Sequence, residues 1–139
     1  MAKVLVVEDN PANMTLATFL LENAGHTVLK ALDAEAGVAL ADAEQPDLIL
    51  MDIQLPGMDG LKATALLKAG IVTREIPVIA LTALAMKGDE ARIRAAGCDG
   101  YIAKPLSYKD FLSTVSQELA KRATAQRATG MAGPEVNDQ

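Results

Sequence analysis

The chain has 139 residues, a length that fits one domain and leaves little room for a second. Its formal net charge of −5 argues against a nucleic-acid or anionic-membrane surface, because both require clustered Lys and Arg side chains. The only cysteine, Cys98, excludes an intrachain disulfide and a thiolate zinc site.

The N-terminal segment has the character of a strand, not of a leader. Its apolar run, Val4 to Val7, is short and is followed at once by the acids Glu8 and Asp9, so we expect no signal peptide. No stretch of the chain approaches the roughly 20 apolar residues that span a bilayer. We therefore expect a cytoplasmic protein.

Two kinds of segment alternate along the chain. Short apolar runs rich in Val, Ile and Leu predict strands buried on both faces, over residues 3–7, 27–30, 47–51, 76–81 and 100–103. Longer segments with helical spacing follow them, over residues 11–24, 33–44, 59–69, 85–96 and 107–123.

The expected helix ends carry recognisable signals. Asn10-Pro11 offers an N-cap followed by proline in the first turn, and Asp33 and Ser107 are further N-cap candidates. Gly25 and Gly97 follow the first and fourth helices, where a left-handed residue is expected.

Five strand–helix units in succession predict an α/β fold with an open parallel sheet, helices on both faces and right-handed crossovers. A barrel of about 250 residues is excluded by the length. Residues 124–139 are small and polar without an apolar period, so we expect a disordered C-terminal tail after a domain of residues 1–123.

Polar residues end four of the five expected strands. Ligands of open α/β sheets bind beyond the carboxyl ends of the strands. Those ends carry Glu8-Asp9, Asp52, Thr82 and Lys104-Pro105. Three carboxylates at one sheet edge are unfavourable unless a cation neutralises them, and oxygen ligands favour Mg²⁺, with Mn²⁺ as an alternative. The sole histidine, His26, lies before the second strand and is badly placed to join them.

A metal-bound carboxylate beside a lysine and a hydroxyl indicates phosphoryl chemistry. The carboxylate can act as a nucleophile and give an acyl phosphate. The metal and the lysine then offset the charge on the equatorial oxygens, and Thr82 can hydrogen-bond to them. Gly57 and Gly60 are expected only to allow the turn after the third strand.

These residues, taken together, resemble the receiver domain of two-component response regulators over residues 3–122. The resemblance lies in Val-Leu-Val-Val-Glu-Asp-Asn at 4–10, Leu-Ile-Leu-Met-Asp-Ile-Gln-Leu-Pro-Gly-Met-Asp-Gly at 48–60, Pro-Val-Ile-Ala-Leu-Thr-Ala at 77–83 and Gly-Tyr-Ile-Ala-Lys-Pro at 100–105. It implies a flavodoxin-like, doubly wound (βα)5 sheet with strand order 2-1-3-4-5.

The resemblance also implies a role for each acidic position. Asp52 would be the phosphoacceptor. Asp9, Asp52 and the backbone carbonyl of Gln54 would bind Mg²⁺, and Glu8 would act through a metal-bound water. All of these positions are intact, so nothing in the sequence indicates a degenerate receiver.

The remaining family positions would act on the phosphoryl group and on the switch. Lys104 would pair with the phosphoryl oxygens, aided by a cis peptide bond between Lys104 and Pro105. Thr82 would move to hydrogen-bond to the phosphoryl group, and Tyr101 would swing inward in response.

The implied function is that of a response regulator which stores a signal. A phosphohistidine on a sensor histidine kinase or a phosphotransfer protein would be the donor. The output would be a protein contact through the face formed by residues 85–96, 100–103 and 107–123, in a monomer without a following effector domain. Residues 51–56 and 82–93 are similar to those of the single-domain cell-cycle regulators of alphaproteobacteria, and similar stretches also occur in receivers of hybrid histidine kinases.

Two other functions compete with this interpretation. A small Mg²⁺-dependent phosphohydrolase could use an aspartyl phosphate, but such enzymes carry a second acid two residues after the nucleophile, where this chain has Gln54. They also need a cap insertion, and no loop is long enough for one. A flavin or nucleotide binder would need a glycine-rich first loop and stacking aromatics, which the sequence lacks.

Overall fold

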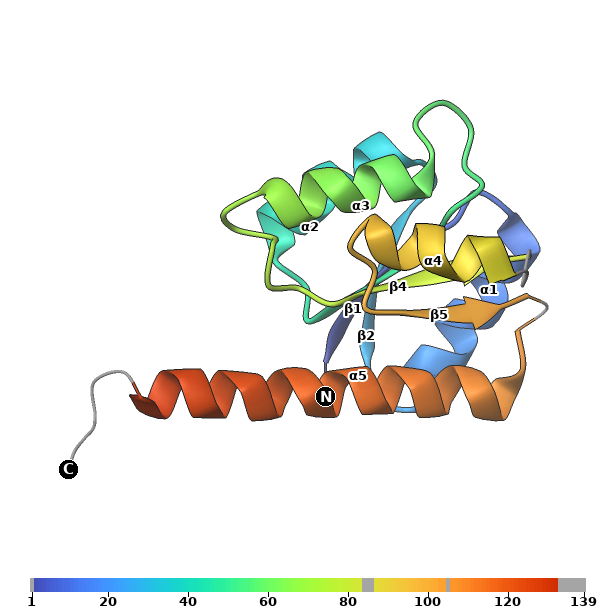
Figure 1. The fold of residues 1–139 in the computed structure, drawn as a ribbon. Helices are drawn as coiled ribbons and strands as arrows, with labels where there is room; N and C mark the ends of the chain where they lie inside the picture. The colour runs from blue at the N-terminus through green and yellow to red at the C-terminus, as the bar shows by residue number, and fades with distance from the viewer. Residues whose placement is uncertain (1, 84–86, 105, 133–139) are drawn as a thin grey trace.

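The computed structural model describes residues 2–83, 87–104 and 106–132. Five parallel strands form one sheet in the order β2-β1-β3-β4-β5 (Figure 1), which confirms the predicted fold class and strand order. The strands are β1 (Lys3–Val7), β2 (Thr27–Ala31), β3 (Leu48–Asp52), β4 (Val78–Thr82) and β5 (Gly100–Ala103).

In the described part of the chain, five helices cover the two faces of the sheet. They are α1 (Pro11–Asn23), α2 (Ala34–Glu44), α3 (Gly60–Ala69), α4 (Lys87–Ala95) and α5 (Tyr108–Ala132). Apolar residues of α2, α3 and α4 share one core cluster with the sheet, and those of α1 and α5 share the other. The sheet therefore lies between two helical layers, as Figure 1 shows.

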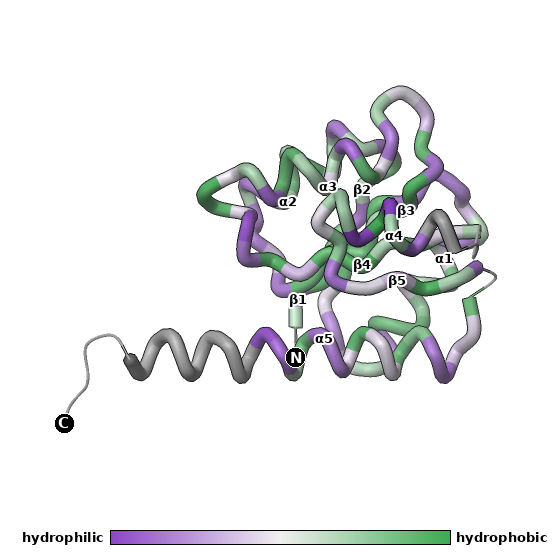
Figure 2. Tube along the Cα trace, in the orientation of Figure 1, coloured by the Kyte–Doolittle hydropathy of each residue, from purple (hydrophilic) through white to green (hydrophobic). Residues whose placement is uncertain are grey.

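Side-chain alternation along the strands builds both clusters at once. Leu5, Ile49 and Val78 belong to the α2–α3–α4 side, whereas Val4 and Leu50 belong to the α1–α5 side. Successive strand residues point to opposite faces, so a strand buried on both faces must be apolar throughout. Figure 2 shows this as continuous hydrophobic colour along the central strands.

The edge strand β2 differs from the prediction that all strands are buried on both faces. Thr27 and Lys30 of β2 are exposed, whereas every residue of β3 and β4 is buried. An edge strand has one neighbour and incomplete helical cover, which leaves polar residues in contact with water. The third strand also begins and ends one residue later than predicted, so Asp52 is its last residue.

The predicted helix ends are largely confirmed. The side chains of Asn10 and Asp33 accept hydrogen bonds from the amides of Asn13 (3.0 Å) and Ala36 (2.8 Å). Gly25 and Gly97 have φ angles of 96° and 107°. Two further ends were not predicted: Asp59 caps α3 through the amide of Lys62 at 2.8 Å, and Gln45 ends α2 with φ of 49°.

Helix α5 does not end near residue 123 as predicted but continues to Ala132 (Figure 1). The added segment, residues 124–132, contains three alanines, one Gln and one Arg, which favour helix, and an established helix propagates more easily than a new one nucleates. Residues 133–139 lie outside the described residues.

Candidate functional site

Parallel strands bring four sequence-distant segments to one edge of the sheet. Asp52 is the last residue of β3 and Thr82 is the last residue of β4, while Glu8 and Lys104 directly follow β1 and β5. Glu8, Asp52 and Thr82 are almost fully buried, with exposures of 1%, 3% and 1%. The predicted site residues therefore converge on a buried polar site.

Lys104 lies between the two buried carboxylates. Its Nζ is 2.9 Å from Oε1 of Glu8 and 3.0 Å from Oδ2 of Asp52. The backbone of Lys104 is held by β4, because its amide donates to the carbonyl oxygen of Thr82 at 2.7 Å. This connection extends the β4–β5 ladder by one residue and aims the lysine side chain at the acids.

Backbone amides hold both carboxylates in place. The amide of Gln54 donates to Oδ1 of Asp52 at 2.9 Å, and the amide of Asn10 donates to Oε2 of Glu8 at 3.1 Å. The amide of Glu8 itself donates to the carbonyl oxygen of Ala31 at 3.0 Å. Each acid is thus oriented by one backbone amide as well as by the side chain of Lys104.

The charges of the site act on one another. Burial, together with the neighbouring carboxyl group of Asp52, raises the pKa of Glu8, even though Lys104 and the Asn10 amide act in the opposite direction. Burial alone would lower the pKa of Lys104, but Glu8 and Asp52 outweigh it and raise the pKa. Lys104 is therefore held in its charged form. The single charge of Lys104 cannot neutralise the carboxylates of the site.

The acids fit a divalent cation. One carboxylate oxygen from each of Glu8, Asp9 and Asp52 lies within 4.8 Å of the others. Oε1 of Glu8 is buried and accepts no well-aligned hydrogen bond from any described residue, although Nζ of Lys104 is close. An oxygen-only donor set of this kind suits Mg²⁺ far better than zinc.

Comparison with known proteins decides the family. The model of the response regulator receiver domain matches residues 4–116. The chain belongs to the response regulator receiver family. The polar-differentiation response regulator DivK of Brucella anthropi is 48% identical over 116 residues, which are 84% of this chain and 94% of that protein. DivK of Brucella ovis matches equally well.

Solved structures of receivers share the fold. The receiver domain of sensor histidine kinase PA1611 from Pseudomonas aeruginosa PAO1, solved with a magnesium ion in its active-site cleft, aligns with a TM-score of 0.80 at 35% identity. The alignment covers 86% of this chain and 98% of that one. A CheY-like receiver from Methanospirillum hungatei JF-1 aligns at 0.82 and 29% identity, covering 90% and 98%.

These findings give the receiver its general function. The protein is a response regulator of two-component phosphorelay signalling. It acts as a signalling switch rather than as a conventional enzyme. Proteins of this family interact with histidine kinases or phosphotransfer proteins and bind magnesium at an acidic pocket. The predicted resemblance to alphaproteobacterial single-domain regulators is confirmed by DivK.

The remaining predicted residues lie around this receiver site. Tyr101 is half-buried on β5 beside Ala80 of β4, and Thr82 follows two residues later on the same face of β4. The hydroxyl of Tyr101 lies 3.5 Å from Oε1 of Glu90 on α4. The predicted cis bond before Pro105 involves a residue outside those that the structure describes.

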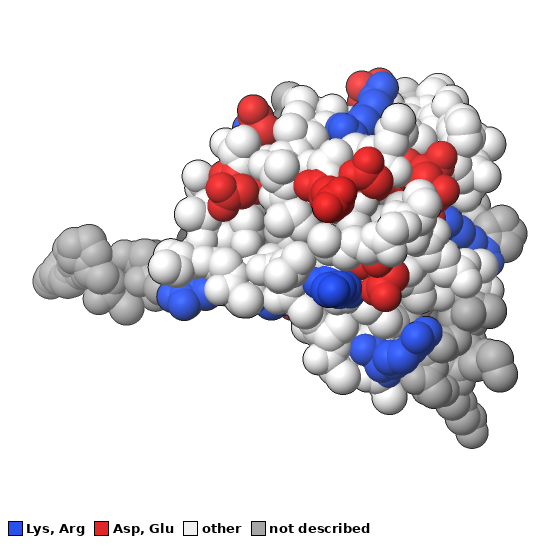
Figure 3. Space-filling view, turned by 90° about the horizontal axis from the view of Figure 1, so that it is seen from above, with Lys and Arg blue, Asp and Glu red and all other residues white. Residues whose placement is uncertain are grey.

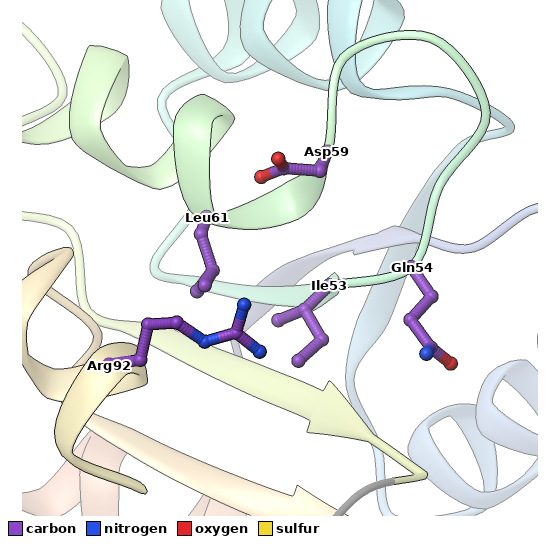
Figure 4. A pocket seen from close by; sticks show the side chains of 5 residues that line it. All are labelled: Ile53, Gln54, Asp59, Leu61 and Arg92. Atoms are coloured by element: carbon purple, nitrogen blue, oxygen red, sulfur yellow. The ribbon is translucent and has the colours of Figure 1, made fainter. Parts of the chain in front are cut away.

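A pocket that sequence reasoning did not predict opens beside the receiver site. It is lined by Ile53 and Gln54 after β3, Asp59 and Leu61 at the start of α3, and Arg92 of α4. Figure 4 shows the Arg92 side chain reaching from α4 toward Ile53 and Leu61. Ile53, Gln54 and Asp59 belong to the segment 48–60, but no pattern in the sequence joins them to Arg92, so only the folded chain could reveal the pocket.

Gly60 makes a close approach to the proposed phosphoacceptor. A Cβ atom at this position would lie 2.1 Å from the backbone oxygen of Asp52 and 2.7 Å from Cα of Ile53. A Cβ at Gly57, which has φ of 76°, would meet nothing within 4 Å. The two glycines predicted together therefore differ: Gly57 serves the turn, and Gly60 lets α3 pack against the backbone of Asp52.

The surface of the receiver agrees with its acidic composition. Figure 3 shows acidic side chains spread over the face that it displays, with basic side chains scattered between them. Within residues 2–83, 87–104 and 106–132, no helix has the length and apolar character needed to cross a membrane.

Proposed function

We propose that this receiver accepts a phosphoryl group on Asp52 from a phosphohistidine of a sensor histidine kinase or a phosphotransfer protein. The observation that carries the proposal is the position of Lys104, whose Nζ lies within 3.0 Å of both Glu8 and Asp52, with Asp9 alongside. A nucleophilic carboxylate next to a fixed cation and further metal ligands is the arrangement that acyl phosphate formation requires.

In the transfer, an oxygen of the Asp52 carboxylate attacks the phosphorus atom and the phosphorus–nitrogen bond breaks. The imidazole nitrogen of the donor keeps the electron pair and leaves. Lys104 then pairs with phosphoryl oxygens, and the Thr82 hydroxyl donates a hydrogen bond to one of them. The amide of Gln54 keeps the attacking carboxylate oriented throughout, because its bond to Oδ1 is already formed.

Mg²⁺ is the proposed cofactor, and Mn²⁺ could replace it. Asp9, Asp52 and the backbone carbonyl of Gln54 would bind it directly, and Glu8 would bind through a water. When bound, the metal neutralises the charge that develops on the phosphoryl oxygens. The acidic cluster and the buried Glu8 oxygen without an aligned donor support this assignment.

The phosphoryl group would favour one of two conformations of the receiver. Thr82 and Tyr101 would reposition, and the face formed by α4, β5 and α5 would present itself to a downstream protein. We propose a cytoplasmic monomer whose partners are proteins and not nucleic acids. Its domain comprises residues 1–123, and residues 124–139 are a C-terminal extension that begins within α5.

The phosphohydrolase remains the weaker candidate. Gln54 stands two residues after Asp52 and cannot act as the general acid that these enzymes use. The family match and the DivK relatives support a signalling role. Any hydrolysis would be the slow loss of the phosphoryl group from Asp52 itself.

Acetyl phosphate with Mg²⁺ tests the proposal. Intact-mass spectrometry should show the gain of one phosphoryl group by the wild type and none by Asp52→Asn. Asp42→Asn, an exposed acid of α2, serves as the matched control and should gain the group normally. A wild type that stays unmodified, or an Asp52→Asn variant that gains as much, contradicts the proposal. Multiple turnovers of a phosphomonoester would favour the phosphohydrolase.

A further inference from the structure

The aromatic side chain of β5 has a specific partner on α4. The hydroxyl of Tyr101 lies 3.5 Å from Oε1 of Glu90. The other carboxylate oxygen of Glu90, Oε2, lies 3.7 Å from Nε of Arg94 one turn later in the same helix. The two oxygens of Glu90 thus connect the β5 tyrosine to a cation of α4.

The rest of Tyr101 is held by apolar contacts on the same side of the sheet. The side chain is half-buried and packs against the core cluster that includes Ala80 of β4 and Ile93 of α4. Glu90 and Ile93 are three residues apart, so they lie on one face of α4. One face of this helix therefore contributes Ile93 to the cluster against which Tyr101 packs and Glu90 to its hydroxyl.

We infer that Glu90 is a positioning residue that holds Tyr101 in the resting conformation of the receiver. The inference rests on the proposed function, in which Tyr101 moves toward Thr82 after Asp52 is phosphorylated. Such a movement must break the hydroxyl contact with Glu90. Glu90 therefore stabilises only one of the two conformations, which is the condition for a residue to shift their equilibrium.

The size of the effect follows from the exposure of the contact. Glu90 and the Tyr101 hydroxyl are open to solvent, so the contact contributes as one weak hydrogen bond. Its removal should change the ratio of the two conformations about two- to five-fold. By linkage, the apparent affinity of the receiver for a phosphoryl mimic at Asp52 should rise by the same factor.

The composition of the chain offers a direct probe. The sequence has two tyrosines, Tyr101 and Tyr108, and no tryptophan. Tyr108 is 62% exposed, so Tyr108→Phe is tolerable and leaves Tyr101 as the single tyrosine. Incorporation of 3-fluorotyrosine into this parent then gives one ¹⁹F resonance, which reports the surroundings of Tyr101. Mg²⁺ with beryllofluoride, a mimic of the phosphoryl group, drives the parent to its modified form.

The experiment compares Glu90→Ala with Glu90→Gln and Arg94→Ala in that parent. Glu90→Ala should move the ¹⁹F population toward the modified form before beryllofluoride is added. It should also lower the beryllofluoride concentration for half conversion about two- to five-fold. The second readout is needed because the loss of a carboxylate alters the resonance locally. Glu90→Gln keeps an acceptor for the hydroxyl and Arg94→Ala leaves the contact intact, so both should behave like the parent.

A double-mutant cycle completes the test. Tyr101→Phe removes only the hydroxyl but leaves the parent without tyrosine, so half conversion in that background is followed by backbone amide resonances. Glu90→Ala should have no further effect on half conversion there. If the parent and Glu90→Ala need the same beryllofluoride concentration for half conversion, Glu90 has no positioning role, although the switch itself still operates. The same conclusion follows if Arg94→Ala lowers that concentration as much as Glu90→Ala does. If the ¹⁹F resonance of the parent does not change on addition of beryllofluoride, Tyr101 does not move on modification of Asp52. That result overturns both the proposed switch and the inference about Glu90.

Discussion

Nζ of Lys104 lies 3.0 Å from Oδ2 of Asp52, while Oδ1 of the same carboxylate accepts a hydrogen bond from the amide of Gln54. The two oxygens of the proposed phosphoacceptor therefore have partners of different kinds. Any substitution of Gln54 except proline keeps its backbone amide, whereas the side chain of Lys104 can be replaced without any change to that amide. Substitution at Lys104 thus tests the electrostatics of the site with the orientation of Asp52 preserved.

Lys104→Met should lower the free energy of unfolding of the metal-free receiver by about 3 kcal/mol, because it leaves two buried carboxylates without their cation. Mg²⁺ should reduce this loss, since it supplies positive charge at the same place. Urea denaturation with and without Mg²⁺ measures both effects.

Lys3→Met provides the control for Lys104→Met. Lys3 pairs with Glu44 at 3.4 Å, and both side chains are more than a third exposed. An exposed pair of this kind contributes about 0–1 kcal/mol. If Lys104→Met costs no more than Lys3→Met, the buried ion pair is not a source of stability.

Glu8→Gln should change how the stability of the metal-free receiver depends on pH. Burial and Asp52 raise the pKa of Glu8 above its ordinary 4.5, so folding favours the protonated acid. The stabilising contribution of protonated Glu8 is fully present below pH 4.5, the ordinary pKa of the group. It is lost as the pH rises through the raised pKa of Glu8 in the folded state. The variant should therefore gain stability relative to the wild type as the pH rises above 4.5.

Thermal unfolding across that pH range measures the difference for Glu8→Gln. Added Mg²⁺ should reverse the order near neutral pH, because it stabilises a site with a charged Glu8 more than one with a neutral amide. Parallel pH curves for the two proteins would contradict the raised pKa. An equal gain from Mg²⁺ would contradict a role for Glu8 at the metal.

Gly60→Ala should destabilise the receiver and slow phosphorylation by acetyl phosphate. Its Cβ would lie 2.1 Å from the backbone oxygen of Asp52, so α3 or the end of β3 must shift, at about 1–3 kcal/mol. Gly57→Ala is the matched control: its strain, about 1 kcal/mol, comes from the positive φ alone and leaves Asp52 in place. Equal phosphorylation rates in the two variants would show that Gly60 does not set the position of Asp52.

Removal of the C-terminal segment tests the proposed boundary at residue 123. Nη1 of Arg122 donates to the carbonyl oxygens of Asp47 at 3.0 Å and Pro46 at 3.4 Å, and so ties α5 to the turn before β3. A chain that ends at residue 123 should keep its unfolding free energy within about 0.5 kcal/mol. One that ends at residue 121 should lose about 1–2 kcal/mol. If the chain that ends at residue 123 loses much of its free energy of unfolding, the extension of α5 beyond that residue belongs to the domain.

Local sequence patterns were sufficient to predict most of the strands and helices of this receiver. The order of strands and helices followed from apolar runs and helix-end residues, because burial between two helical layers requires continuous apolar strands such as β3 and β4. The end of α5 and the exposed edge strand β2 did not follow. Helix continuation depends on propagation from a packed helix, and edge exposure depends on which strand lies outermost.

The sequence by itself identified which residues carry the chemistry: Asp52 at the end of a buried strand, Glu8 and Asp9 after the first strand, and Lys104 after the last. Parallel strands align their carboxyl ends, so convergence could be expected from order alone. Only the tertiary structure decided the contacts that depend on distance between elements. The two ion pairs of Lys104, the approach of Gly60 to Asp52 and the contact between Tyr101 and Glu90 join segments whose spacing no local pattern encodes.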